Sequence, residues 1–149
     1  MKKRLKKLLT EETIFLNLQA DTKEGIIREI LDRLTAGGYI SDIEACFQAI
    51  MKRENKMSTG MENGIAIPHG KTDRIDDLVA AIGRKKEGVE FDSMDNKPST
   101  IFVMTISPLS HSGPHLQFLA EVSRLLKEEE TRRLLLSAQS VRDVIDIFV

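Results

Sequence analysis

The sequence predicts a single-domain α/β sandwich, in which a mixed sheet of about five strands is flanked by helices on both faces. Three observations support this fold class. A chain of 149 residues with 41% hydrophobic side chains suits one globular domain with one sizeable core. Segments with helical and strand periodicity alternate along the chain, with no linker or repeat between them. The run 100–106 shows no polar face, as a central strand covered on both sides requires.

The first part of the chain predicts one strand and two helices. Residues 13–18 alternate in polarity, as a half-buried strand does. Asp21 and Glu24 fit an N-cap residue and its capping-box partner, and the helix that they open ends at the glycine pair 37–38. The segment 41–44 repeats this capping pattern and opens a second helix. The residues that we expect to face the core are Ile26, Ile27, Ile30, Leu31, Leu34, Ile43, Cys46, Phe47, Ile50 and Met51.

Four later segments supply the remaining strands. The apolar residues 65–67 form a short strand that stops at Pro68, because proline has no backbone N–H to donate to a sheet. Residues 78–82 and 100–106 are longer apolar runs, and 88–91 is a short strand beside a turn. Together with the first strand, these segments give the five strands of the expected sheet.

From Ser112 onward the chain is predicted to be helical. Gly113 and Pro114 lie in the first helical turn, where proline is tolerated. The segment 140–143 caps a last helix. The expected core-facing residues are Leu116, Leu119, Ala120 and Leu126 in the first of these helices, and Val141, Val144, Ile145 and Phe148 in the second.

Composition excludes several functional classes. The net charge of −1 creates no long-range field that would attract nucleic acid, so we expect no nucleic-acid partner. The single cysteine, Cys46, excludes an internal disulfide and any multi-cysteine metal or redox motif. Apolar runs fall well short of the ~20 residues of a membrane span, and the basic start precedes no signal-peptide core. We therefore expect a cytoplasmic protein that does not insert into the membrane.

The N-terminal segment 2–9 is rich in lysine and arginine and has leucines at helical spacing. An arm that binds phosphate or membrane is one interpretation. A short helix with a solvated basic face is the simpler one, and the leucine spacing favours it.

One histidine, His69, stands where chemistry is expected. It follows the apolar run 65–67 and Pro68 and precedes Gly70, which would let another backbone or a phosphate come close. An imidazole with an ordinary pKa of about 6.5 is largely neutral in the cytoplasm, so it can act as nucleophile, general base or metal ligand. A histidine held in a tight turn by a backbone hydrogen bond is the alternative, and spacing alone does not separate the two.

Two further side chains could assist such a histidine. Arg53 lies at the end of the second helix and could clamp an anion through two parallel hydrogen bonds, although a solvated surface cation is the simpler interpretation. His115 lies in the first turn of the helix after Ser112, where the helix dipole favours an anion and lowers the pKa of an imidazole. Packing at the helix end is the alternative role for His115.

The segment between Arg53 and His69 could cradle a phosphate. Ser58, Thr59 and Gly60 supply hydroxyls and flexible amides, and Asn63 follows in a turn. The lysine-serine ending of a P-loop is missing, which argues against nucleotide binding.

Taken together, these motifs resemble a known family. The matching residues are Arg53, Glu54, Ser58, Thr59, Gly60, the run Asn63-Gly64-Ile65-Ala66-Ile67-Pro68-His69-Gly70-Lys71, Pro108, His115 and Leu116. They are similar to the enzyme IIA domain of the fructose/mannitol class of the bacterial phosphotransferase system, a class that includes the nitrogen-related regulatory IIA proteins. The resemblance extends from about Leu5 to Val149, so we expect one IIA domain over residues 1–149.

The resemblance implies a phosphotransferase component, a phosphoryl carrier that works without a cofactor or metal. His69 would accept a phosphoryl group from the small carrier HPr and pass it to a cysteine of a IIB domain, which serves sugar uptake through a IIC membrane permease. Phosphoryl transfer depends mainly on positioning and charge stabilisation. Arg53 would therefore steady the phosphoryl oxygens, and His115 would donate a second hydrogen bond. Thr59 and the glycines around it, with Gly70, would let the loop approach.

The sequence departs from the family pattern at two methionines and one histidine. Met57 and Met61 flank the Ser-Thr-Gly segment, and they would form part of an apolar docking surface for HPr. His111 is an extra histidine that could replace His115 as the second histidine of the site. We choose His115 because Leu116 follows it and because it lies inside the predicted helix.

Two other functions stay open. A regulatory IIA protein would use the same chemistry but would bind other proteins according to its phosphorylation state. A metal-dependent hydrolase would gather a zinc ion instead, although no close ligand pair such as His-Glu-x-x-His supports it. The candidate zinc ligands would be His69, Asp73, His111 and His115.

Overall fold

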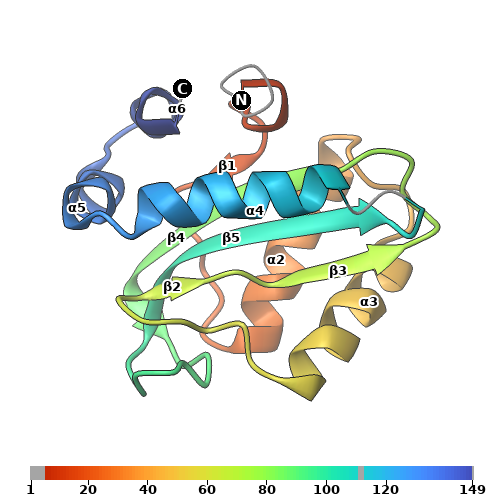
Figure 1. The fold of residues 1–149 in the computed structure, drawn as a ribbon, viewed down its shortest axis with the longest axis horizontal. Helices are drawn as coiled ribbons and strands as arrows, with labels where there is room; N and C mark the ends of the chain where they lie inside the picture. Colours follow the sequence, from red (N-terminus) through yellow and green to blue (C-terminus); the bar gives the residue numbers. More distant parts are fainter. Residues whose placement is uncertain (1–5, 111–112, 149) are drawn as a thin grey trace.

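The computed structural model of the protein describes residues 6–110 and 113–148. Its elements are labelled in Figure 1. In chain order they are β1 (Ile14–Phe15), α2 (Lys23–Ala36), α3 (Ile43–Lys56), β2 (Ile65–Ala66), β3 (His69–Thr72), β4 (Val79–Val89), β5 (Ser99–Pro108), α4 (Gly113–Leu126), α5 (Glu129–Ser137) and α6 (Val141–Phe148). Residues 6–8 form a helical turn, while the rest of the expected basic helix falls largely on residues 1–5, outside the described part of the chain.

The sheet confirms the predicted mixed arrangement of five strands. Its order is β1-β4-β5-β2, and β3 also pairs with β5. The central strands β4 and β5 are antiparallel, whereas β1 runs parallel to β4, and β2 and β3 run parallel to β5. Ile65 lies opposite Ile101 and His69 opposite Thr105, so β2 and β3 keep one register along β5. They are one edge strand that is interrupted at Pro68, which has no N–H to donate.

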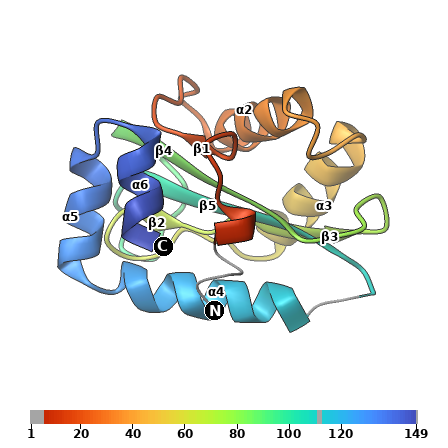
Figure 2. The same ribbon diagram turned by 90° about the horizontal axis from the view of Figure 1, so that it is seen from above.

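Helices cover both faces of the sheet, as predicted. Figure 2 shows α2 and α3 on one face and α4 on the opposite face. Alternate residues of a strand point to opposite faces, so β5 contributes to two apolar clusters. Phe102, Met104 and Ile106 pack with α2 and α3, whereas Ile101 and Val103 pack with α4 and α6. The sheet is therefore the middle layer of a three-layer fold.

Two helix caps lie one residue later than predicted. Thr22, and not Asp21, caps α2, because the Thr22 hydroxyl accepts the hydrogen bond from the Gly25 N–H at 3.0 Å. The Asp21 carboxylate instead pairs with the buried Lys85 ammonium at 3.0 Å, which needs a counter-charge. The second helix differs in the same way: the predicted pattern starts at Ser41, but it is the Asp42 carboxylate that accepts from the Ala45 N–H. The predicted cap of the last helix is confirmed, because the Ser140 hydroxyl accepts from the N–H at position 143.

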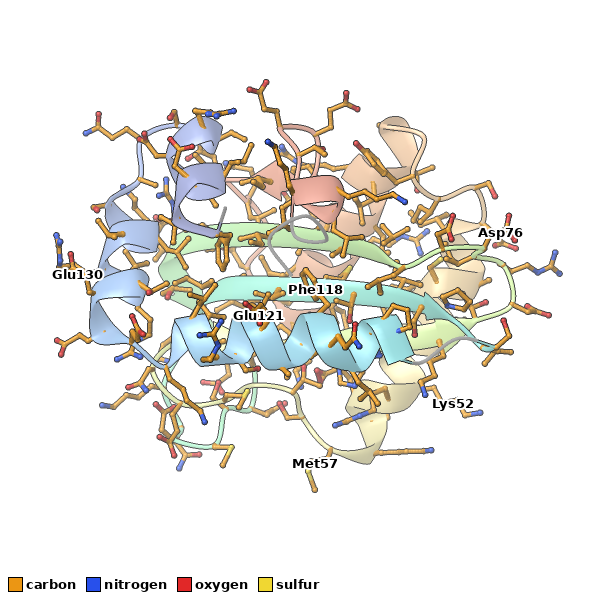
Figure 3. All side chains as sticks on the ribbon, turned by 45° about the horizontal axis from the view of Figure 1, so that its top comes forward. Lys52, Met57, Asp76, Phe118, Glu121 and Glu130 are labelled. Atoms are coloured by element: carbon orange, nitrogen blue, oxygen red, sulfur yellow. The ribbon has the colours of Figure 1, made fainter. Side chains whose placement is uncertain are left out.

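The predicted core stripe of α4 is confirmed at Leu126, which is buried, and is wrong at Leu116 and Ala120, which are exposed. The buried residues of α4 are His115, Phe118, Val122 and Leu126. Leu116 is 63% exposed, and Phe118 lies between the helix and the sheet in Figure 3. His115 is polar but buried, so the apolar pattern alone did not identify it as part of the buried face.

Two strands also differ from their predicted bounds. β4 runs on to Val89 and absorbs the start of the short strand expected at 88–91. His69 opens β3 and does not lie in a turn, because the chain resumes pairing with β5 directly after Pro68. Within residues 6–110 and 113–148, no helix combines the length and apolar character needed to cross a bilayer.

Candidate functional site

The position of Gly70 determines which way His69 faces. A Cβ atom at Gly70 would lie 2.8 Å from the Ala49 carbonyl carbon and 2.8 Å from the Ile50 nitrogen, both in the backbone of α3. Only glycine allows β3 to come this close to α3. Because side chains alternate along a strand, the neighbours of Gly70, His69 and Lys71, face the opposite side, toward α4.

The His69 imidazole is half-buried, and one of its nitrogens is already engaged. Nδ1 lies 2.8 Å from the backbone carbonyl oxygen of Ile67. A carbonyl oxygen only accepts hydrogen bonds, so Nδ1 carries the ring hydrogen. Nε2 therefore keeps its lone pair. The backbone hydrogen bond expected for a merely structural histidine is present, and it also leaves a nucleophilic nitrogen available.

The second histidine, His115, lies against the first. It is the third residue of α4 and is 3% exposed, and its Nε2 lies 2.9 Å from the hydroxyl of Thr105. The centroids of the His69 and His115 rings are 5.4 Å apart, and the rings are tilted by 52°. Thr105 is the residue opposite His69 in the β3–β5 ladder. One strand position thus brings together two histidines that are distant in the sequence.

The environment of His115 keeps its imidazole neutral. Burial lowers the pKa of His115 to about 4, with smaller contributions from the charges of His69 and Lys71. The sequence predicted a lowered pKa from the helix start, but burial is the main cause. The Nδ1 atom of His115 and the hydroxyl of Ser107 are buried, and neither has a hydrogen-bond partner within residues 6–110 and 113–148.

Arg53 lies at the end of α3 and is tied to its own helix terminus. Its Nη1 donates a hydrogen bond to the Met57 carbonyl oxygen at 2.6 Å. Within residues 6–110 and 113–148, no hydrogen bond joins this guanidinium to His69 or His115. The structure therefore brings the two histidines together but leaves Arg53 capping a helix.

The segment that was expected to cradle a phosphate is held by a buried carboxylate. Glu54, which is 5% exposed, accepts hydrogen bonds from the Thr59 N–H at 3.0 Å and from the Thr59 hydroxyl, and it pairs with the Lys23 ammonium at 3.4 Å. The Ser58 hydroxyl donates to Phe91 O and accepts from the Gly60 N–H.

The same segment is fixed at its far end and along β2. The Asn63 N–H donates to the Asp95 carboxylate at 3.1 Å. The Thr59 carbonyl oxygen accepts from the Ile67 N–H at 3.1 Å. Because protein groups already occupy these donors and acceptors, the segment supports β2, the strand that precedes His69.

Sequence reasoning assigned no role to four residues of this region, although Glu54 and Lys71 were among the residues that match the family, and two of the four had a local signal. Thr105 is a polar residue inside the apolar run of β5, which was treated as having no polar face. Glu54 falls on the apolar stripe of α3, four residues after Ile50, so its burial could have been predicted. Lys23 and Lys71 carried no such signal, because surface lysines are common.

An apolar groove lies beside β2 and the C-terminal end of α4. It has a volume of roughly 260 Å³ and is lined mainly by Met61, Ile65, Ile67, Met94 and Leu126. Met94 is 70% exposed. The nearby Met57 is equally exposed and points away from the fold in Figure 3. Methionines suit a surface that meets more than one partner, because their side chains adapt in shape.

Metal binding receives no support from the described geometry. Among residues 6–110 and 113–148, no three histidine, cysteine, aspartate or glutamate side chains are grouped to hold a metal ion. His111, one of the four candidate zinc ligands, lies outside these residues.

Comparison with known proteins identifies the family of the chain. Residues 7–149 match the family described as phosphoenolpyruvate-dependent sugar phosphotransferase system, EIIA 2. The chain belongs to this EIIA family. The match covers both histidines, Arg53 and the supporting segment, and it confirms the family that the sequence motifs indicated.

Two curated relatives carry fructose-specific names. The chain is 39% identical over 136 residues to the fructose-specific EIIA component of Haloferax volcanii. The matched region covers 91% of this chain and 88% of that protein. It is also 39% identical over 144 residues to the fructose-specific EIIABC component of Bacillus subtilis, covering 97% of this chain. The chain spans only 23% of that second protein, which is much longer.

Two solved structures show the same fold. The nitrogen regulatory protein IIA-Ntr of Neisseria meningitidis superposes with a TM-score of 0.87 at 27% identity, covering 96% of this chain and 97% of that one. Enzyme IIAMTL of Escherichia coli, in a complex with phosphorylated enzyme IIBMTL, gives a TM-score of 0.80 at 28% identity, covering 94% and 96%. The EIIA family therefore includes transport and regulatory members of similar structure.

Proposed function

We propose that the chain is the phosphoryl carrier of a sugar phosphotransferase system, which accepts a phosphoryl group from phospho-HPr on Nε2 of His69 and passes it to a cysteine of a IIB domain. The observation that supports this most directly is the 2.8 Å hydrogen bond between His69 Nδ1 and the Ile67 carbonyl oxygen. It fixes the tautomer in which Nε2 is the nucleophile.

Phosphoryl transfer to His69 needs only a free lone pair on Nε2 and an imidazole ring that stays stable once it is phosphorylated. The Nε2 lone pair of His69 attacks phosphorus, and the P–N bond to the histidine of HPr breaks and returns its electron pair to that ring. The phosphorylated imidazole still carries hydrogen on Nδ1, so the hydrogen bond to Ile67 persists and stabilises the charge on the ring. Transfer to a cysteine thiolate then forms an S–P bond and restores the neutral ring.

Nearby donors stabilise the phosphoryl oxygens. His115 lies beside His69 and contributes a hydrogen-bond donor, while Lys71 faces the same side of β3 and adds positive charge. Arg53 would have to release the Met57 carbonyl oxygen to reach the phosphoryl group. We therefore assign Arg53 to a state in which a partner or the phosphoryl group is bound.

The apolar groove beside β2, on the strand segment that leads to His69, is the surface on which the donor and acceptor domains would dock. A complex of enzyme IIAMTL with phosphorylated IIBMTL supports a IIB partner, and the fused EIIABC protein supports a IIC permease. The HPr donor follows from the family resemblance. We expect this exchange to take place in the cytoplasm, where soluble carriers meet.

Phosphorylation of the purified chain tests this function. The protein is incubated with phosphoenolpyruvate, enzyme I and HPr, and its intact mass is measured. We expect one added phosphoryl group, labile in acid and stable in alkali, as an N-linked phosphate is. His69→Ala should remain unlabelled while its circular dichroism matches the wild type. Labelling that persists in His69→Ala would overturn the assignment.

A regulatory role is the second candidate, and the structural similarity to IIA-Ntr favours it. Such a protein would accept the phosphoryl group on the same nitrogen but would control other proteins by binding them. Incubation of the phosphorylated chain with a fructose or mannitol IIB domain separates the two. Rapid transfer to the IIB cysteine supports transport, whereas a stable phosphoprotein supports regulation.

A further inference from the structure

We propose that Thr105 is a positioning residue, whose hydroxyl fixes the tautomer and the orientation of the His115 ring. This inference rests on the proposed function, in which His115 assists phosphoryl transfer at His69. Thr105 itself would not touch the phosphoryl group. It would act by determining which His115 nitrogen carries the hydrogen.

Thr105 bonds to both histidine-bearing segments. Its backbone N–H donates to the Pro68 carbonyl oxygen at 3.1 Å, directly before His69. Its hydroxyl lies 2.9 Å from His115 Nε2. Thr105 is fully buried at 0% exposure, so no water competes for either bond. The residue therefore sets the position of one histidine relative to the other.

Counting donors indicates the direction of the hydroxyl bond. If the Thr105 hydroxyl donates to Nε2, the His115 hydrogen is on Nδ1 and only that N–H is left without a partner. If Nε2–H donated instead, two buried groups would lack partners: the hydroxyl hydrogen of Thr105 and the Nδ1 lone pair. An unpaired buried polar group is costly, so the first arrangement is favoured.

This tautomer gives the two histidines different roles. The hydroxyl of Thr105 occupies the only lone pair of His115, which therefore cannot compete as a nucleophile. His69, whose Nδ1–H bonds to the Ile67 carbonyl oxygen, keeps a free lone pair on Nε2. Nδ1–H of His115 then has no partner among the residues that the structure describes. We assign that N–H as the donor to a phosphoryl oxygen on His69.

Ring nitrogen NMR of the unphosphorylated protein tests the tautomer directly. In ¹⁵N-labelled wild-type protein at neutral pH, we expect His115 to show a protonated Nδ1 and an unprotonated Nε2. Thr105→Val keeps the shape of the side chain and removes the hydroxyl, so His115 should become a mixture of tautomers. Thr105→Ser keeps the hydroxyl and should preserve the wild-type pattern.

Thr100→Val is the matched control. Thr100 lies on the same strand, but its hydroxyl donates to the Gly64 carbonyl oxygen and not to a histidine. This variant should leave the His115 tautomer unchanged. Hydrogen on Nε2 of His115 in the wild type would overturn the inference, and so would an unchanged tautomer in a folded Thr105→Val. If Thr105→Val does not fold, a lost pattern in Thr105→Ser decides against the inference.

Phosphoryl transfer supplies the functional test. We expect Thr105→Val to slow phosphorylation of His69 by about tenfold or more, since misplacing one hydrogen-bond donor at a transfer site has effects of this order or larger. Thr105→Ser should restore most of the rate. A rate in Thr105→Val equal to that of the wild type would contradict the positioning role. Because the NMR measurement needs no phosphorylation, failure of the proposed function would be seen separately as absence of labelling at His69.

Discussion

Two buried polar clusters lie at the central strands of the sheet, one around Arg84 on β4 and one around His115 and Thr105 on β5. They differ in how many of their polar atoms have a hydrogen-bond partner. Around Arg84, which is 6% exposed, Nε and Nη1 donate to the carbonyl oxygens of Leu16, Leu135 and Ala138. The neighbouring Lys85 ammonium is paired as well, with the Gln19 carbonyl oxygen and a carboxylate. This cluster joins the loop after β1 and the end of α5 to strand β4.

The cluster around His115 is equally buried but incomplete. Thr105 bonds to one ring nitrogen, while in the described part of the chain the other nitrogen and the Ser107 hydroxyl have no partner. An unpaired buried group costs about 1–3 kcal/mol. The same fold provides hydrogen-bond partners for the buried Arg84 guanidinium, so it could also have provided a partner for each nitrogen of the His115 imidazole. In the proposed function this difference has a reason: the Arg84 cluster would serve stability, while the His115 cluster would keep a donor available for the phosphoryl group.

The largest effect should follow from breaking the complete cluster. Arg84→Met keeps the length of the apolar stem but leaves the carbonyl oxygens of Leu135 and Ala138 unpaired. We expect the free energy of unfolding, measured by urea denaturation, to fall by about 3 kcal/mol or more. The matched control is Arg124→Met, whose side chain is 69% exposed and pairs only with Glu121. That variant should change stability by less than about 0.5 kcal/mol.

The same variant also tests the functional side of the comparison. Under conditions where Arg84→Met remains folded, its rate of phosphorylation by HPr should match that of the wild type, because Arg84 is bonded to α5 and the loop after β1 and to neither histidine. A large loss of rate in the folded variant would mean that the two clusters are coupled, and the division between them would be wrong.

The second effect is a pH dependence that belongs to the incomplete cluster. Burial lowers the pKa of His115 to about 4 in the folded protein, against 6.5 in the unfolded chain. Below pH 6.5 the unfolded chain binds a proton at this position while the folded protein does not, so stability falls as the pH drops toward 4. The expected loss between pH 7 and pH 4 is roughly 2–3 kcal/mol.

His115→Gln isolates this contribution, because glutamine does not titrate. The difference in unfolding free energy between wild type and variant should change across the window from pH 6.5 to pH 4 and stay constant above it. A constant difference at every pH would show that the imidazole is not buried in its neutral form.

The comparison also shows what periodicity predicts and what it does not. The apolar pattern was sufficient for the layers, the mixed sheet and most helix bounds, because these depend on which side chains avoid water. The apolar pattern failed in the first turn of α4, where the polar side chain of His115 is buried against the sheet. The capping pattern failed at Asp21, because the Asp21 carboxylate pairs with Lys85, which is distant in the sequence.

The sequence predicted which histidines belong to the site but not how they are arranged in space. His69 and His115 were identified from their local contexts and from family resemblance, and the structure brings them together. The residue between them, Thr105, was overlooked because a single threonine in an apolar strand resembles any other strand residue. Its role depends on the register of β3 against β5. Such a long-range pairing is not encoded in the local pattern around any one residue.

The smallest effect concerns two serines of strand β5, and it tests whether the unpaired hydroxyl is real. Ser107 and Ser99 are both 0% exposed. The Ser99 hydroxyl is 3.0 Å from the Ser93 hydroxyl, whereas the Ser107 hydroxyl has no partner. Ser99→Ala should therefore lower the free energy of unfolding by about 1–2 kcal/mol, because it leaves Ser93 unpaired.

Ser107→Ala should have the opposite sign. Removing a buried hydroxyl that bonds to nothing relieves its desolvation cost, so we expect stability to stay the same or to rise by up to about 1 kcal/mol. Urea denaturation of the two variants at neutral pH measures the contrast on one strand. If Ser107→Ala costs as much as Ser99→Ala, the Ser107 hydroxyl must have a partner in solution. The His115 cluster would then be more complete than the structure shows, and its difference from the Arg84 cluster would rest on the His115 Nδ1 atom alone.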